Sequence, residues 1–285
     1  MMYADVIGDP VAHSKSPFIH NFWLNELGLA GDYRAHHVTA PDLESYLLAR
    51  RDDASWRGCN ITIPHKEAAY RLIVEQGLGV QGLGVLGPGE ADFGAINTVV
   101  RHPQTGELTG HNTDVEGVTG PLKRHALPSG PLEIAIIGAG GAARAALWGL
   151  HHLDSGHRFR ILVRRPEQGV ALLDAMGIQG EVLPIATQSL EGAQLLINAS
   201  PLGMAGKPPL DLGLAAMDRA NGVVFDMVYV PLETALLAEA RALGMGTIDG
   251  LQMLVSQAAR AFQLFFGREV PRDLVAEIHE RLRAS

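Results

Sequence analysis

A glycine-rich segment that joins an aliphatic run to a helix-forming run constrains the fold of this chain most. The segment reads EIAIIGAGGAARAALWGL over residues 133–150. The aliphatic run predicts a strand, Gly138 permits a tight turn, and Gly140 lets the backbone approach a diphosphate at the N-terminus of the next helix. Ala143 takes the third small position of the G-x-G-x-x-G/A pattern, which allows close helix-on-strand packing. The segment therefore predicts a dinucleotide site, with a structural glycine turn as the alternative. The residues assigned to this site are Gly138, Ala139, Gly140, Gly141 and Ala142.

The chain on both sides of this segment alternates between strand-like and helix-like runs. The second half is typical of a doubly wound sheet, and the first half repeats a β-α pattern and ends in a hairpin. The run Pro128–Pro131 (PSGP) is the best linker signal. We therefore expect an α/β protein of two domains. Strands are predicted at 3–7, 33–38, 58–63, 93–100, 133–137, 159–163, 181–185, 194–197, 222–226 and 246–248, and helices include 17–27, 41–51, 64–74, 116–127, 141–152, 167–176 and 231–243.

Composition excludes several classes of protein. No apolar run reaches the length of a membrane span, and the N-terminus lacks the basic and apolar regions of a signal peptide. The net charge of −8 argues against a general nucleic-acid binder and favours a cytoplasmic enzyme. The one cysteine, Cys59, lies in an apolar strand and is expected to pack. The histidines show no metal-ligand spacing, so no metal is expected.

Two arginines follow the second strand of the expected dinucleotide domain, where such folds usually place an acid on the adenosine ribose. Arg164 and Arg165 suit a 2′-phosphate through bidentate hydrogen bonds and stacking. NADP is therefore preferred over NAD, and Glu167 would reverse this preference if it faced the ribose. Met227, at a later strand end, is a candidate nicotinamide contact, with core packing as the rival interpretation. Gly250 is also assigned to the cofactor site.

Polar side chains in the first domain gather near expected strand ends. Ser14 and Ser16 are suited to hold a carboxylate, although Ser16 alternatively caps a helix that begins at Pro17. Thr62 and Lys66 follow the strand 58–63, at the edge where α/β sheets bind ligands. A lysine in the first turn of a helix opposes the macrodipole, which favours a functional role for Lys66.

Hydride transfer at a nicotinamide also requires a group that exchanges the hydroxyl proton. Lys66 with the nearby carboxylate Asp114 is the best acid–base pair that the sequence offers. Asn97 lies beside the hairpin that precedes Asp114, where capping of a turn is the alternative. Gln257 lies one to two turns into a long apolar helix and is placed to reach a substrate.

Seven ordered motifs make the chain similar to the shikimate/quinate dehydrogenase family. They are GDPVAHSKSP, NITIPHK, GAINTV, GHNTDVEG, GAGGAA, DMVY-P-T and DGLQMLVSQAA. The resemblance implies a substrate domain over 1–115 with helices of 251–285 packing back on it, and a Rossmann-like NADP domain over 116–250. It also implies reversible oxidation of shikimate to 3-dehydroshikimate. By resemblance Lys66 and Asp114 are catalytic, Ser14 and Ser16 bind the substrate carboxylate, and Thr62, Asn97, Tyr229 and Gln257 bind the rest of the substrate.

Three positions depart from the family pattern. The glycine-rich segment 77–90 is longer than usual, His111 replaces a common tyrosine, and Val163 replaces an asparagine before Arg164. Quinate or an aminoshikimate is therefore the alternative substrate, with NAD as the alternative cofactor. A ligand-sensing homologue and an enzyme acting on folates are weaker alternatives. The protein is expected to be a monomer or a homodimer.

Overall fold

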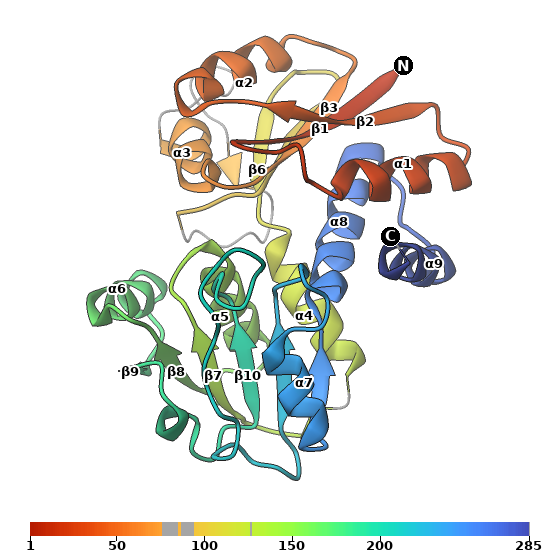
Figure 1. Cartoon of the computed structure of the whole chain (residues 1–285). Coiled ribbons are helices and arrows are strands. Elements are labelled where there is room, and N and C mark those ends of the chain that lie inside the picture. Colours follow the sequence, from red (N-terminus) through yellow and green to blue (C-terminus); the bar gives the residue numbers. More distant parts are fainter. Residues whose placement is uncertain (76–84, 87–93, 126, 285) are drawn as a thin grey trace. The chain divides into compact units, whose positions relative to one another are not determined.

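The computed structural model describes residues 1–75, 85, 86, 94–125 and 127–284, and the chain divides into two compact units (Figure 1). Unit 1 combines Met1–Thr113 with Gln257–Ser285, and unit 2 is the continuous stretch Asp114–Ser256. The two ends of the chain therefore build one unit together. No helix of the described residues is both long enough and apolar enough to cross a membrane.

Unit 1 contains a mixed sheet with the strand order β2-β1-β3-β5-β6-β4. Strand β1 pairs in parallel with β2 and β3, whereas β5 runs antiparallel to β3 and β6. The elements are β1 (Met2–Gly8), α1 (Ser16–Glu26), β2 (Gly31–His37), η1 (Ala40–Asp42), α2 (Leu43–Arg51), β3 (Trp56–Ile61), α3 (Lys66–Tyr70), the π-turn η2 (Arg71–Glu75), β4 (Val85–Leu86), β5 (Thr98–Arg101), β6 (Leu108–His111), α8 (Gly250–Phe266, which enters from unit 2) and α9 (Arg272–Arg283).

The C-terminal helices complete the core of unit 1. Phe262 of α8 meets the Trp23 ring of α1 edge to face, at 5.7 Å between centroids. Trp23 also donates its indole N–H to the carbonyl of Leu274 in α9. A Cβ on Gly58 of β3 would lie 2.6 Å from the ring of Phe265, so this strand is open enough to accept the helix only because position 58 has no side chain. Cys59 is fully buried beside it and has a free thiol, as its apolar setting predicts.

Unit 2 contains a six-stranded sheet in the order β12-β11-β10-β7-β8-β9, in which all neighbouring strands are parallel. This is the strand order of the dinucleotide-binding fold, with the topological switch between β7 and β10. The doubly wound prediction is confirmed. The elements are α4 (Asp114–Arg124), β7 (Glu133–Ile137), α5 (Gly141–Leu153), β8 (Arg158–Leu162), α6 (Pro166–Met176), β9 (Gly180–Leu183), η3 (Thr187–Leu190), β10 (Leu195–Asn198), β11 (Val223–Asp226), α7 (Ala235–Ala242) and β12 (Gly246–Ile248).

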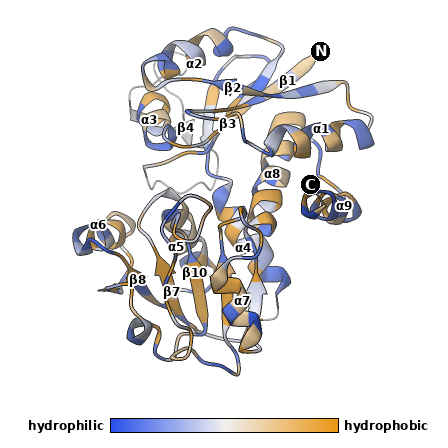
Figure 2. Ribbon diagram, viewed as in Figure 1, coloured by the Kyte–Doolittle hydropathy of each residue, from blue (hydrophilic) through white to orange (hydrophobic). Residues whose placement is uncertain are grey.

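The central strands of this sheet, β7, β10 and β11, are buried on both faces. In β7, Ile134 and Ile136 join the cluster that contains α4, α5 and α6, whereas Ala135 and Ile137 join the cluster that contains α7. Figure 2 accordingly shows β7 and β10 as hydrophobic strands without an alternating polar side. Such a continuous apolar pattern is the signature of a parallel sheet covered by helices on both sides.

Several predicted boundaries are wrong by a few residues. Helix α1 begins at Ser16 with Lys15 at the cap position and no side-chain cap, so Ser16 is not the helix cap. Strand β5 begins at Thr98, later than predicted, and the N–H of Ile96 just before it bonds to the carbonyl of Lys66 instead of to a neighbouring strand. Helix α4 begins two residues earlier than expected, with the acidic Asp114 in its first turn.

Helix α7 begins at Ala235, four residues later than predicted. The Thr234 hydroxyl accepts the N–H of Leu237 and so caps the helix at this point. The glycine-rich segment 77–90 lies outside the described residues apart from β4, which pairs in parallel with β6.

Candidate substrate and cofactor sites

The paired serines lie where the chain leaves β1 and enters α1. The Ser14 hydroxyl accepts the backbone N–H of Ser16 at 3.3 Å, which holds the two residues close together. Ser16 is buried and shares a hydrogen bond with the side chain of Tyr33, whereas Ser14 is half-buried. Two adjacent hydroxyl groups of this kind form a suitable site for a carboxylate.

Thr62 and Lys66 follow the carboxyl end of β3, as the sequence predicts. Thr62 continues the β1 ladder through its N–H to the carbonyl of Ile7, and its carbonyl accepts the N–H of His65. Lys66 is half-buried and is the first residue of α3. Its carbonyl accepts the N–H of Ile96, which ties the lysine backbone to the segment that carries Asn97.

Asn97 connects three predicted parts of the substrate region. Its side-chain oxygen accepts the Thr113 N–H at 2.8 Å and the hydroxyl of Thr98 at 2.9 Å. The hydroxyl oxygen of Thr113 in turn lies 3.5 Å from the side-chain oxygen of Gln257. Asn97 therefore anchors the end of the hairpin, and the structure brings Asn97 and Gln257 to the same polar network.

A buried chain of hydrogen bonds extends this network to the serines. The Tyr33 hydroxyl donates to Asn60 at 2.6 Å, and the Asn60 amide donates to Thr98 at 2.9 Å. Tyr33 and Asn60 are both deeply buried, and burial raises the pKa of the tyrosine well above its usual value. Ser16 and Asn97 are thus linked through residues that do not themselves belong to the predicted site.

Two predicted substrate or catalytic residues belong to unit 2. Asp114 is buried at the first residue of α4, directly after Thr113 in the chain. Tyr229 is half-buried in the segment after β11, and burial raises the pKa of its phenol.

The glycine loop has the backbone geometry that the sequence predicts. Gly138 has φ +106°, a value that L-residues rarely adopt, and a Cβ there would lie 3.1 Å from the Ala199 carbonyl. Gly140 is extended, and a Cβ on it would meet no heavy atom within 4 Å. Helix α5 begins at the next residue without a side-chain cap, and Ala143 is fully buried against the sheet.

A cavity of about 190 Å³ opens over this loop. One wall is the loop from Ile137 to Gly140, and a second is the turn from Ala199 to Leu202. Arg164 and Arg165 follow β8 and line the same cavity with exposed side chains. The lining residues include Gln168 and do not include Glu167, which lies exposed in the first turn of α6. Val163 contributes to the wall and to the core behind it.

These features fit a dinucleotide with a 2′-phosphate. The space beside Gly140 leaves the first N–H groups of α5 accessible, and a helix N-terminus attracts a phosphate. The two guanidinium groups supply positive charge on the same cavity, at the distance along the chain where dinucleotide folds read the ribose. We therefore treat this cavity as the cofactor site.

Met227 and Gly250 form a contact that the sequence does not reveal. A Cβ on Gly250 would lie 2.5 Å from the Met227 carbonyl and 2.6 Å from the Val228 carbonyl. Gly250 is buried, so its absent side chain is required for this packing. Met227 is half-buried and packs on the main core of unit 2, which agrees with the packing interpretation of this residue.

Sequence reasoning missed the residues that hold the predicted ones in place. Tyr33 lies in no motif, and its role depends on which strands are neighbours. Asn198 and Asp226 stand at predicted strand ends, yet their mutual hydrogen bond of 2.9 Å follows only from the pairing of β10 with β11. Thr98 lies in the GAINTV motif, Thr113 in GHNTDVEG and Asp226 in DMVY-P-T, and these motifs were the available signals.

Two parts of the chain match family models. Residues 6–77 match the shikimate dehydrogenase substrate binding domain, and residues 250–278 match the shikimate 5′-dehydrogenase C-terminal domain. A relative from Sphingopyxis alaskensis, named shikimate dehydrogenase (NADP(+)), is 46% identical over 99% of this chain and 97% of its own length.

Solved structures agree over the whole length. The shikimate 5-dehydrogenase of Thermus thermophilus, in complex with NADP(H) and shikimate, has a TM-score of 0.84 and 33% identity, covering 99% of this chain and all of its own. A quinate dehydrogenase of Corynebacterium glutamicum, in complex with NAD, has a TM-score of 0.80 and 29% identity over 100% of this chain and 99% of its own. The full-length relative at 46% identity decides the assignment, and the chain belongs to the shikimate dehydrogenase family.

Proposed function

We propose that the protein is an NADP-dependent shikimate dehydrogenase that oxidises shikimate reversibly to 3-dehydroshikimate. The observation that carries the proposal is the relative of that name, which matches at 46% identity over almost the full length of both chains. The polar network of unit 1 and the cavity over the glycine loop supply the two kinds of site that this reaction needs. The quinate dehydrogenase is similar at 29% identity, which makes shikimate the preferred substrate.

The cofactor assignment rests on chemistry that the cavity residues provide. We assign the diphosphate to the backbone of Gly138, Ala139, Gly140, Gly141 and Ala142, and the 2′-phosphate to Arg164 and Arg165. An exposed cavity wall with two guanidinium groups favours NADP over NAD, because NAD has no 2′-phosphate for them to bind. Met227 and Gly250 are assigned to the nicotinamide end of the site.

The substrate residues are assigned by the groups that they offer. Ser14 and Ser16 bind the carboxylate through their hydroxyl groups. Thr62, Asn97 and Gln257 bind ring hydroxyls or the carboxylate, and Tyr229 contributes its phenol from unit 2. The buried network holds Ser16 and Asn97 in fixed rotamers, which supports the discrimination of one hydroxyl pattern from another.

Lys66 and Asp114 are the proposed acid–base pair. When held by the glycine loop and the two arginines, NADP would supply the hydride acceptor for the alcohol carbon. In this direction the Lys66 amine takes the proton of the reacting hydroxyl, and in reverse the ammonium group returns it. The Asp114 carboxylate fixes the lysine side chain and accepts a hydrogen bond from the substrate hydroxyl. This arrangement requires no metal.

Steady-state kinetics with shikimate and quinate, each with NADP and NAD, tests the proposal. The highest kcat/KM is expected for shikimate with NADP. Preference for quinate with NAD would replace the proposal with its alternative, and no reduction with any of the four pairs would refute both. We further propose a cytoplasmic location. We also propose a monomeric or homodimeric state, and sedimentation can determine which of the two states the protein adopts.

A further inference from the structure

Asp226 is a buried carboxylate that connects three separate segments of unit 2. It is the last residue of β11 and is 1% exposed. One carboxylate oxygen accepts the Asn198 amide at 2.9 Å and the Val228 N–H at 3.0 Å, and the other accepts the Thr234 hydroxyl at 2.7 Å. The donors belong to the end of β10, the turn after β11 and the start of α7.

The bond to Asn198 reaches one wall of the cofactor cavity. The Asn198 side-chain oxygen accepts both the N–H and the hydroxyl of Ser200, and its amide also donates to the carbonyl of Leu202. The side chain of Asn198 therefore holds the turn that follows β10 through three hydrogen bonds. Ala199 to Leu202 of this turn line the cavity, and the Ala199 carbonyl packs against Gly138.

The bond to Val228 fixes the segment that carries Met227. This peptide is held from one side by the carboxylate and from the other by Gly250, whose backbone leaves no room for a Cβ against the Met227 carbonyl. Asp226 thus holds both the turn after β10 and the turn after β11. Only the first of these turns is a wall of the cavity over the glycine loop, and the Asp226 side chain does not line that cavity.

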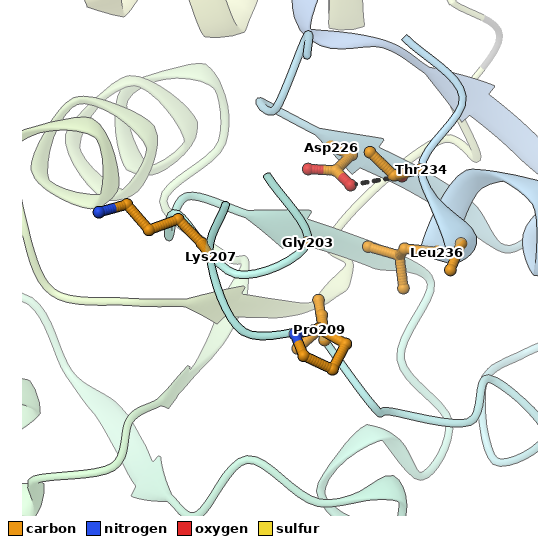
Figure 3. Close-up of a pocket in the computed structure, with 8 residues that line it drawn as sticks. Gly203, Lys207, Pro209, Asp226, Thr234 and Leu236 are labelled. Atoms are coloured by element: carbon orange, nitrogen blue, oxygen red, sulfur yellow. Dashed lines mark hydrogen bonds between the residues drawn. The ribbon is translucent and has the colours of Figure 1, made fainter. Parts of the chain in front are cut away.

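A second cavity of about 220 Å³ lies on the other side of this carboxylate (Figure 3). Its lining includes Asp226, Thr234 and Leu236, and the Lys207 side chain extends away from the carboxylate. Space therefore exists beside Asp226, so a smaller or neutral side chain can be accommodated without a steric clash.

We propose that Asp226 is a positioning residue for dinucleotide binding, because its carboxylate holds Asn198 and thereby sets the turn after β10, which forms one wall of the cofactor cavity beside the glycine loop. This inference deepens the proposed function and rests on its assignment of that cavity to NADP. The role is geometric. Any side chain at position 226 that accepts hydrogen bonds from Asn198 and Val228 and also forms one with Thr234 is sufficient to hold the turn in place.

The main test compares Asp226→Ala with Asp226→Asn. Alanine removes both acceptor oxygens and thus all three hydrogen bonds, and we expect the Kd for NADP to rise about tenfold or more, as for unpaired buried donors. Asparagine keeps one oxygen for Asn198 and Val228, while its amide donates to the Thr234 oxygen. Its Kd is therefore expected to stay within about threefold of the wild-type value. Isothermal titration with NADP measures both, without requiring turnover.

A matched control is Asp5→Ala. Asp5 is also 1% exposed, lies in unit 1 and accepts hydrogen bonds from Tyr46 and Trp56. This variant is expected to lose thermal stability and to bind NADP as the wild type does. A general effect of deleting a buried carboxylate would weaken NADP binding in both variants and would overturn the proposal.

Thr234→Val covers the case in which Asp226→Ala does not fold. It removes the hydroxyl that donates to Asp226, and we expect it to raise the Kd for NADP, as Asp226→Ala does. Thr234→Ser keeps the hydroxyl and is expected to have the wild-type Kd. Wild-type affinity in a folded Asp226→Ala protein, or equal loss in Asp226→Ala and Asp226→Asn, would refute the role of hydrogen-bond geometry. Failure of the proposed function can be told apart from failure of this inference. In that case the wild-type protein does not oxidise shikimate, whatever Kd values for NADP the titrations of the variants give.

Discussion

Alanine substitutions at two neighbouring glycines separate the fold of the loop from its binding role. At Gly140 the backbone is extended (φ −86°, ψ −170°), a conformation that alanine adopts, and no atom lies within 4 Å of the new methyl group. Alanine is a poorer N-cap than glycine by about 0.5–1 kcal/mol, and it reduces the entropy of the unfolded chain by a similar amount. The free energy of unfolding of Gly140→Ala should therefore stay within about 0.5 kcal/mol of wild type.

Binding should change much more than stability in this variant. The methyl group occupies the space through which a phosphate reaches the backbone N–H groups. Loss of one charge-assisted hydrogen bond costs about 1.5–3 kcal/mol, which is roughly a 10- to 150-fold increase in the Kd for NADP. Gly138→Ala behaves differently, because φ +106° is unfavourable for alanine by about 1–3 kcal/mol. Its melting temperature should fall by about 2–12 °C.

Thermal unfolding and isothermal titration with NADP on the same samples measure both effects. Gly177→Ala is the control, since Gly177 has φ +62° at the end of α6 and does not line the cavity. It should lose stability and retain NADP affinity. Wild-type affinity in Gly140→Ala would show that the dinucleotide does not approach this backbone, and unchanged stability in Gly138→Ala would refute the conformational reasoning.

Three further predictions concern single side chains. Arg164→Ala should raise the KM for NADP roughly 10- to 100-fold and that for NAD much less, and an equal effect on both in steady-state assays would exclude contact with the 2′-phosphate. Lys66→Ala should lower kcat by about 10²- to 10⁴-fold while NADP still binds, and near-normal turnover would remove Lys66 from the acid–base role. Burial raises the pKa of Asp5 above the ordinary value of 3.8 for this side chain, despite hydrogen bonds from Tyr46 and Trp56 and the charge of Arg50, which lower it. The folded state therefore holds this proton more tightly than the unfolded chain, so this residue's contribution to stability falls as pH rises from 3.8 through the raised pKa. The free energy of unfolding of Asp5→Asn, measured in urea, should lack this pH-dependent contribution. An identical pH dependence of the free energy of unfolding in Asp5→Asn and the wild type would contradict the prediction.

The parts of the fold that depend on local pattern could be predicted from the sequence. The glycine loop, its flanking strand and helix, and the alternation of unit 2 follow from residues that are close in the chain. Helix ends were less accurate. Thr234 moved the start of α7 because a side-chain cap outweighed the apolar pattern that begins at Pro231.

The links between site residues could not be predicted, because they depend on which strands lie side by side. The bond from Asn198 to Asp226 requires the pairing of β10 with β11, and the chain from Tyr33 through Asn60 to Thr98 requires β3 to lie between β1 and β5. The polar residues were visible in the sequence as single strand-end features. Their connection is a property of the sheet order.

The way in which unit 1 is assembled from both ends of the chain also has a consequence for synthesis. On the ribosome, residues 1–113 emerge first, and the helices that carry Phe262 and Phe265 emerge only after all of unit 2. At about 5–20 residues per second this delay is roughly 7 to 30 s. Throughout it the face of Trp23 and the strand at Gly58 lack their covering rings. The nascent N-terminal segment is therefore a natural client for chaperones, whereas unit 2, continuous in sequence, can fold as soon as it is released.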